Sequence, residues 1–481
     1  MADPGKKQKD YSEEAKTAIS AAWDQAKASG NYKASAEQLM ALEKQTRNAS
    51  DAPSTTLLVQ AILSLAYDSK DQAYVLECLT VLSKKHGQFK TSVTTMVDQV
   101  MEWLPAIKEK EGIKTWLEWV GALRTVTEGK IFLETPRARV TLALALYHEG
   151  LANKPVEGSP TPAESLQTAS DLLQELQVET YSSMELREKI EILLEQMRLL
   201  MLVARIKDEQ AAAAGGLADG EADWVKMKVG GRKVNEGFIN KPENKDLKLK
   251  FHELMIEHSL RHSAYLEVAK SFYKIWEMPS IQEDQDGAAQ SALEHIVYYL
   301  ILAPYDNEQS DMINRLYVDP ALSKPRREAY YNLVKRFVTK ELMRWSGIRE
   351  FFGPILSASD VFNGPNGEKR LKDLHTRVTE HNIRVIAEYY SKISLQRLTD
   401  LLMLSRDETE EVLSRLVVSG MVWARIDRPA GIVTFRQKRS AEEVMNDWSS
   451  DMNKMLGLVD KAWMTMSAEV AARSVASKSH A

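Results

Sequence analysis

The sequence predicts a mostly α-helical protein, built as an α-solenoid of helical hairpins, a winged helix and one long C-terminal helix. Three observations lead to this fold class. From about residue 10 to residue 350, apolar residues recur at helical spacing, interrupted by clusters of Gly, Pro, Asn and Ser. Residues 371–437 then read as three helices and a hairpin, and residues 441–470 carry a continuous apolar stripe.

Length and composition agree with an extended, ordered chain. The 481 residues argue against one compact globule, because a typical domain has about 100–200. With 44% hydrophobic and 27% charged residues, the chain has enough apolar side chain for a core and is too apolar for a disordered protein. The formal charge of -5 means that the protein as a whole does not attract polyanions. Binding to nucleic acid or anionic lipid would therefore require a local basic patch.

An N-terminal solenoid is predicted over residues 1–245. Its paired helices are expected at 36–46, 54–67, 72–85, 91–103, 115–127, 136–148, 163–176 and 184–207. No fixed-period consensus is visible, so the helical repeats are divergent. The low-complexity stretch 208–223, DEQAAAAGGLADGEAD, is predicted to be an exposed loop insertion because it combines an alanine run with three glycines.

A second domain is predicted over residues 246–437 and ends in a winged helix, 371–437. Ser394 is placed to cap the middle helix of this winged helix, and Ser405 with Glu408 forms a capping box for the third. Gly420 lies where that third helix is expected to end in a left-handed residue. The expected helices of the domain are 247–260, 264–276, 288–302, further short helices as far as Phe352, and then 371–390, 395–402 and 405–418. The expected strands are 422–426 and 432–436.

The first surface predicted to contact another protein is the second strand of the wing. It contains Ile432, Val433 and Phe435. We expect this strand to be a sheet edge, whose unpaired N–H and C=O groups are a liability unless another chain covers them.

The second predicted surface is the last helix, expected from 441 to about 470 within a C-terminal segment 440–472. Its apolar stripe consists of Val444, Trp448, Met452, Met455, Val459, Trp463, Met466 and Val470. At ~1.5 Å per residue the stripe extends ~40 Å, which is more than the small winged helix can cover. We therefore expect the helix to join a multi-helix bundle; the alternative is that it folds back along the solenoid.

The residue pattern predicts no catalytic, cofactor or metal site. Cys78 lies among apolar residues at helical spacing, which favours core packing over a nucleophile. His258 and His262 share a helix face at i, i+4, but Ser259 follows His258 where a zincin has Glu, so a solvated helix face is favoured over a metal site. Gly129-Lys130 lacks the Ser or Thr that a P-loop requires.

Nucleic acid is a less favoured partner than protein. The helix that would enter the major groove, 405–418, contains four carboxylates against two arginines, and phosphates would be repelled by them. The hairpin is more basic, with Arg425, Arg428, Arg436, Lys438 and Arg439. Weak RNA contact through this hairpin therefore stays as an alternative.

A reducing, aqueous compartment is expected for the chain. One cysteine permits no intramolecular disulfide. The first ten residues contain no apolar stretch of the kind a secretory signal needs. The longest apolar run, 296–303, is far below the ~20 residues that span a bilayer. We expect a protein of the cytoplasm and nucleus, without membrane contact.

A helical solenoid that runs into a winged helix resembles the PCI module, found in the proteasome lid, the COP9 signalosome and translation initiation factor three. Within that family, several strings between Met184 and Ser449 closely resemble non-ATPase subunits of the 26S proteasome regulatory particle lid. These strings are MELREKIEILLEQMRLLM, LILAPYDNEQSDMINRL, KELMRWS, LKDLHTRVTEHNIRVIAEYYSKIS, DRPAGIVTF and NDWS.

The resemblance implies a TPR-like solenoid, a PCI domain and a non-catalytic scaffold that supports lid assembly in ubiquitin-dependent protein degradation. It implies contacts with other PCI subunits, with the lid deubiquitinase subunit and with the proteasomal base and core particle. In the family, winged helices pair edge to edge and C-terminal helices form a bundle, while the zinc isopeptidase is a different subunit. A PCI subunit of the COP9 signalosome and an RNA-binding PCI protein are the two alternatives.

Overall fold

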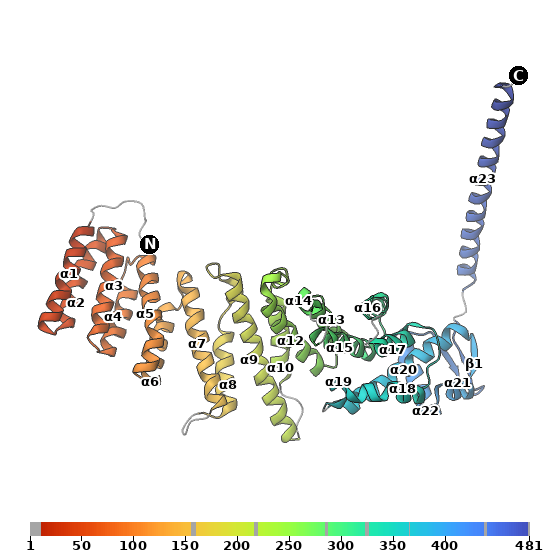
Figure 1. Ribbon diagram of the computed structural model, residues 1–481, viewed down its shortest axis with the longest axis horizontal. Coiled ribbons are helices and arrows are strands. Elements are labelled where there is room, and N and C mark those ends of the chain that lie inside the picture. The colour runs from red at the N-terminus through yellow and green to blue at the C-terminus, as the bar shows by residue number, and fades with distance from the viewer. Residues whose placement is uncertain are drawn as a thin grey trace. The chain divides into compact units, whose positions relative to one another are not determined.

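The computed structural model describes residues 11–154, 160–215, 220–283, 287–322, 327–364, 366–436 and 440–479. It divides into two compact units, Met1–Ala289 and Gln290–Ala481. Helices make up most of both units, and the second contains a small three-stranded sheet (Figure 1). The predicted fold class is confirmed.

The first unit is a row of helices in which each element packs mainly on its neighbours in the chain (Figure 1). Its α-helices are α1 (Ser12–Ser29), α2 (Tyr32–Asn48), α3 (Ala52–Asp68), α4 (Gln72–Lys84), α5 (Lys90–Lys110), α6 (Ile113–Thr127), α7 (Glu134–Asn153), α8 (Pro162–Gln174), α9 (Leu186–Ala213), α10 (Glu221–Lys233), α11 (Glu236–Ile239), α12 (Lys245–Arg261), α13 (Tyr265–Trp276) and α14 (Pro279–Glu283). Such local packing is the arrangement of a solenoid.

Side-chain caps fix where several of these helices begin. Asn31 and Asp71 accept hydrogen bonds from the first turns of α2 and α4. Thr161 and Glu164 form a complete capping box at α8. Gly30 ends α1 with a φ of 68°, a conformation that a residue with a Cβ rarely adopts.

An aromatic cluster lies in the core of the first unit. Trp119 is fully buried, and its ring meets Tyr67 and Trp103 edge-on at centroid distances of 6.4 and 6.5 Å. Tyr67 also stacks on Trp103 at 4.4 Å. Helices α3, α5 and α6 each contribute one ring, so this cluster ties consecutive hairpins together.

The predicted loop 208–223 is shorter than expected. Residues 208–213 continue α9 and residues 221–223 begin α10; residues 216–219 lie outside the described residues. Asp208 anchors the connection by accepting hydrogen bonds from the Gly220 N–H at 3.2 Å and from Trp224 Nε1 at 3.0 Å. Alanine has the highest helix propensity, which explains why the Ala-rich part is helical.

The second unit contains a helical part followed by the winged helix. Its α-helices are α15 (Ala288–Leu302, which begins just before the unit boundary), α16 (Asn307–Val318), α17 (Glu328–Val338), α18 (Trp345–Ala358), α19 (Asp360–Asn363), α20 (Gly367–Tyr389), α21 (Leu395–Leu402), α22 (Arg406–Val418) and α23 (Ala441–Ser479). Its strands are β1 (Lys392–Ser394), β2 (Arg425–Asp427) and β3 (Ile432–Thr434).

Candidate protein-interaction surfaces

The winged helix is assembled by local signals that agree with its tertiary packing. Ser394 caps α21, and Ser405 with Glu408 forms the predicted capping box at α22. Gly420, with a φ of 75°, follows the end of α22 as expected. Buried apolar side chains of α20, α21, α22 and the sheet then form one small core, which includes Ile386, Leu398 and Leu413.

The prediction that strand 432–436 is a sheet edge is wrong. The strand order is β1-β3-β2, so β3 lies in the centre and pairs antiparallel with both neighbours. The side chains of Val433 and Phe435 are buried in the core of the winged helix, while Ile432 is partly exposed. The second neighbour of β3 is β1, a three-residue strand between α20 and α21 that no residue pattern predicted.

The outer strands β1 and β2 are the edges that the described residues leave unpaired on one side. Beside β2, a groove of about 1040 Å³ is lined by residues of α22 and of the hairpin. Its apolar lining includes Val418, which is 86% exposed, and the partly exposed Trp423. An exposed edge next to exposed apolar side chains is typical of a protein contact.

Charged side chains of both signs lie on the exposed surface of the winged helix beside β2. Glu410 of α22 pairs with Arg406 at 3.4 Å and with Arg428 of the hairpin at 3.0 Å. Glu410 is therefore shared by two arginines, and its single negative charge balances only one of them. Arg425 and Arg436 remain exposed, and Lys438 and Arg439 lie outside the described residues.

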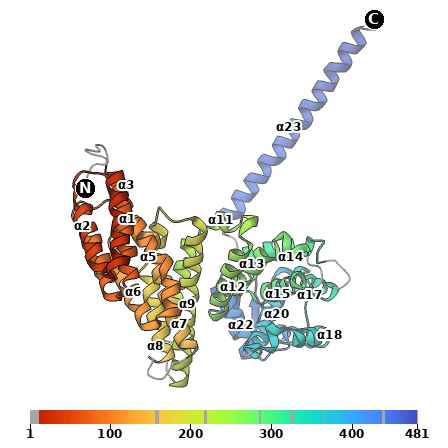
Figure 2. The same cartoon turned by 60° about the vertical axis from the view of Figure 1, so that its left-hand side comes forward.

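The last helix, α23, is longer than predicted and is exposed at every residue from 440 to 471. Figures 1 and 2 draw it as one uninterrupted helix. It begins with a capping box, in which Ser440 Oγ accepts from the Glu443 N–H and a Glu443 carboxylate oxygen accepts from the Ser440 N–H. The stripe residues Val444, Trp448, Met452, Met455, Val459, Trp463, Met466 and Val470 are between 44% and 68% exposed.

The histidine pair at the C-terminal end of α12, where His262 directly follows the last helical residue, is not a solvated face, which corrects that expectation. His258 is buried, stacks on His262 with 4.5 Å between ring centroids, and meets the Trp224 ring edge-on. His262 Nε2 lies 3.2 Å from a Glu221 carboxylate oxygen. Burial lowers the pKa of His258 to about 4. The pair therefore packs α12 against α10.

Cys78 is buried in the core of the first unit, as predicted, and burial raises the pKa of its thiol. Within the described ranges, no three His, Cys, Asp or Glu side chains are grouped so that they could hold a metal ion. No helix in this part of the chain is long and apolar enough to cross a membrane.

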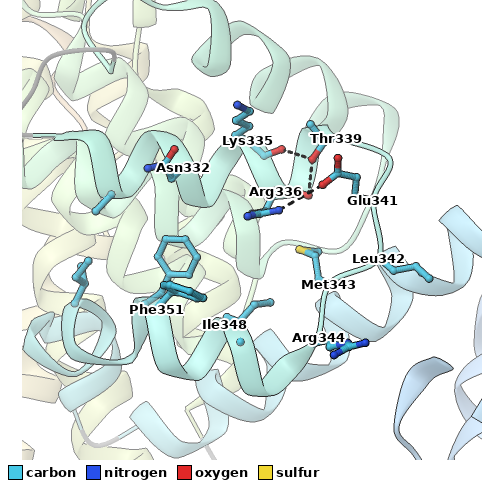
Figure 3. Close-up of a pocket in the computed structure, with 14 residues that line it drawn as sticks. Asn332, Lys335, Arg336, Thr339, Glu341, Leu342, Met343, Arg344, Ile348 and Phe351 are labelled. Carbon is cyan, nitrogen blue, oxygen red and sulfur yellow. Dashed lines mark hydrogen bonds and ion pairs between the residues drawn. The ribbon is translucent and has the colours of Figure 1, made fainter. Parts of the chain in front are cut away.

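A groove between α17 and α18 is a further exposed feature of the second unit (Figure 3). Ile348 and Met343 are buried along it, whereas Phe351 is 76% exposed. Arg336 reaches across its rim to Glu341, with 3.4 Å between nitrogen and oxygen. Sequence periodicity places Phe351 on a helix but carries no signal that its ring is exposed.

Two family descriptions match the chain: "PSMD12/CSN4, N-terminal" over residues 34–284 and "PCI domain" over residues 335–437. The 26S proteasome regulatory subunit RPN5 of Saccharomyces cerevisiae is 38% identical over 421 residues, covering 87% of each chain. The 26S proteasome non-ATPase regulatory subunit 12 of Dictyostelium discoideum is 37% identical and covers 90% of this chain and 88% of its own. Homolog A of that subunit in Arabidopsis thaliana is 34% identical, with 90% and 96% covered.

Proposed function

The chain belongs to the PSMD12/CSN4 family of PCI-domain proteins, and from this membership we propose that it is a non-catalytic scaffold subunit of the 26S proteasome regulatory particle lid. The observation that carries the scaffold role is α23, whose apolar stripe is exposed along its described length. A stripe of this length costs free energy in water unless other helices cover it. The resemblance indicates what covers the stripe, namely a bundle of C-terminal helices from neighbouring subunits.

The winged helix supplies a second contact in this proposal. The edges β1 and β2 carry backbone groups that a strand or loop of another PCI subunit can pair with. The partners are other PCI subunits, the lid deubiquitinase subunit and, through the lid, the proteasomal base and core particle. We expect the protein in the cytoplasm and the nucleus, where it supports lid assembly and ubiquitin-dependent degradation.

The test is purification of the tagged full chain from cells, followed by mass spectrometry of what accompanies it. Lid subunits together with proteasomal ATPases are the expected result. COP9 signalosome subunits without proteasomal ATPases would favour the nearest alternative, which the family description also covers. A salt-dependent shift of labelled RNA at micromolar concentrations of the pure chain would favour the RNA-binding alternative.

A further inference from the structure

A polar cavity of about 600 Å³ lies in the second unit, and its lining includes no residue of α23. It is bounded by α16, the end of α17, α20 and residues 421–423 before β2. Arg384 of α20 lines it together with Tyr305, Lys340 and Glu388. Neither family resemblance nor sequence periodicity pointed to this place.

Arg384 is a largely buried cation without a carboxylate partner among the described residues. Its guanidinium carbon lies 3.5 Å from the centroid of the Tyr305 ring, and its Nε is buried with no hydrogen-bond acceptor in the described part of the chain. Burial lowers the pKa of this arginine, yet an arginine side chain keeps its charge in proteins. The ring offsets part of the desolvation cost, but buried charges in proteins are normally paired with an opposite charge.

The other charges around the cavity cancel one another. Lys340 pairs with Glu388. Glu380, one turn before Arg384, attracts the Arg384 charge, but it pairs directly with Arg377 at 2.5 Å and does not line the cavity. His381 lines it but is neutral at pH 7, because burial lowers its pKa to about 4. The balance of these groups is one positive charge, that of Arg384, which Tyr305 and the more distant Glu380 stabilise without an ion-pair contact among the described residues.

We propose that this cavity receives the carboxylate of an Asp or Glu side chain from a neighbouring polypeptide in the assembled complex, with Arg384 as its ion-pair partner. A carboxylate matches both the single positive charge and the planar fork of the guanidinium. Trp423, 41% exposed at the cavity, adds apolar area that a docked segment would bury. The inference rests on the proposed function, since it needs an assembly to supply the neighbour.

The test places a photoreactive amino acid at Ser310, which lines the cavity, in the tagged full chain. After assembly in cells, irradiation is expected to cross-link a neighbouring subunit within a few residues of an Asp or Glu. Arg384→Glu should reduce this cross-link at least tenfold, and replacing the identified carboxylate with Arg should restore it. Arg315→Glu is the matched control, because Arg315 lies on α16 outside the cavity and pairs with Asp311 at 2.7 Å.

Arg384→Gln keeps the test valid if charge reversal unfolds the domain: it should retain the thermal transition of the unsubstituted chain and still lose the cross-link. Equal cross-linking by Arg384→Gln, or a cross-linked segment without a carboxylate, overturns the proposal. Free anions are tested on the isolated full chain with sodium phosphate against sodium chloride at equal ionic strength. Stabilisation by phosphate that Arg384→Gln abolishes would assign the site to a solution anion and overturn the docking.

These outcomes are separate from failure of the proposed function. If the unsubstituted chain brings down no lid subunit, the lid assignment fails. If it assembles normally and the Arg384 variants assemble and cross-link as it does, only the docking of a carboxylate fails.

Discussion

Glu43 is a fully buried carboxylate that holds two helical hairpins together. It accepts hydrogen bonds from Arg47 Nε at 3.1 Å and from Lys85 Nζ at 2.9 Å. Glu43→Ala removes the only carboxylate that pairs with both cations among the described residues, although Arg47 also donates to the His86 carbonyl, so we expect a loss of about 3 kcal/mol in the free energy of unfolding. Glu411→Ala is the control, because Glu411 pairs with Arg415 on the surface, where such pairs contribute about 0.5 kcal/mol or less.

Urea unfolding of the full chain, followed by circular dichroism, measures both losses. A loss for Glu43→Ala that is no larger than the loss for Glu411→Ala would show that solvent readily replaces the buried carboxylate.

Buried histidines make the fold sensitive to acid. Burial lowers the pKa values of His252, His258 and His381 from 6.5 to about 4. Between these pH values the unfolded chain binds more protons than the folded one, so stability is complete above about pH 6.5 and falls as the pH drops toward 4. At pH 5 we expect each histidine to cost on the order of 1–2 kcal/mol.

The measurement compares thermal transitions of the full chain at pH 7 and pH 5. His258→Gln should reduce the difference between the transition temperatures at pH 7 and pH 5, because glutamine does not titrate. An unchanged difference would mean that His258 does not contribute to the acid sensitivity.

At the scale of the element, α23 should be dispensable for folding and required for assembly. Its described residues from 440 to 471 are exposed, so ending the chain after Arg439 removes no buried contact of those residues. We expect the thermal transition of the isolated chain to shift by no more than about 2 °C, while stable association with lid subunits is lost. A truncation that unfolds the chain but still assembles would place the stripe in the internal core.

Point variants test whether the apolar stripe, and not the helix in general, makes the contact with other subunits. Met455→Glu puts a charge on the apolar stripe and should reduce co-purification of lid subunits at least tenfold, because a buried unpaired carboxylate is costly. Ser450→Glu is the matched control, since residue 450 lies on the opposite face of the helix from the stripe. Equal effects of the two variants would show that the stripe is not the contact surface.

At the scale of the whole molecule, a substitution in one hairpin of a solenoid should destabilise only the adjacent hairpins. Trp119→Ala leaves a cavity in the aromatic cluster and should cost about 3–5 kcal/mol, and Trp119→Phe should cost less. Because each hairpin packs mainly on the next, amide hydrogen exchange should accelerate in α3 to α7 and stay unchanged in residues 395–434. Hydrogen-exchange mass spectrometry of the full chain measures this, and faster exchange throughout would contradict the two-unit organisation.

The sequence by itself determined what depends on neighbours in the chain. Helical periodicity, the capping box at Ser405 and Glu408, the stop at Gly420 and the stripe of α23 are all local signals, and the structure confirms each as a helix start, a helix end or an exposed face. Local signals are readable because a helix satisfies its backbone hydrogen bonds within about four residues. The interface role of the stripe stays a prediction, as do the domain boundaries drawn from composition.

Only the tertiary structure decided which segments meet. The three-residue strand β1 is too short to show a period of two, so its pairing with β3, and hence which strands are edges, could not be read from the chain. His258 is buried because α10 covers it, although its spacing also fits an exposed face. The cavity at Arg384 gathers residues from several elements between 305 and 435. Sheet pairing, the burial of a side chain and the net charge around a cavity depend on contacts between residues far apart in the chain. A local sequence pattern therefore does not reveal them.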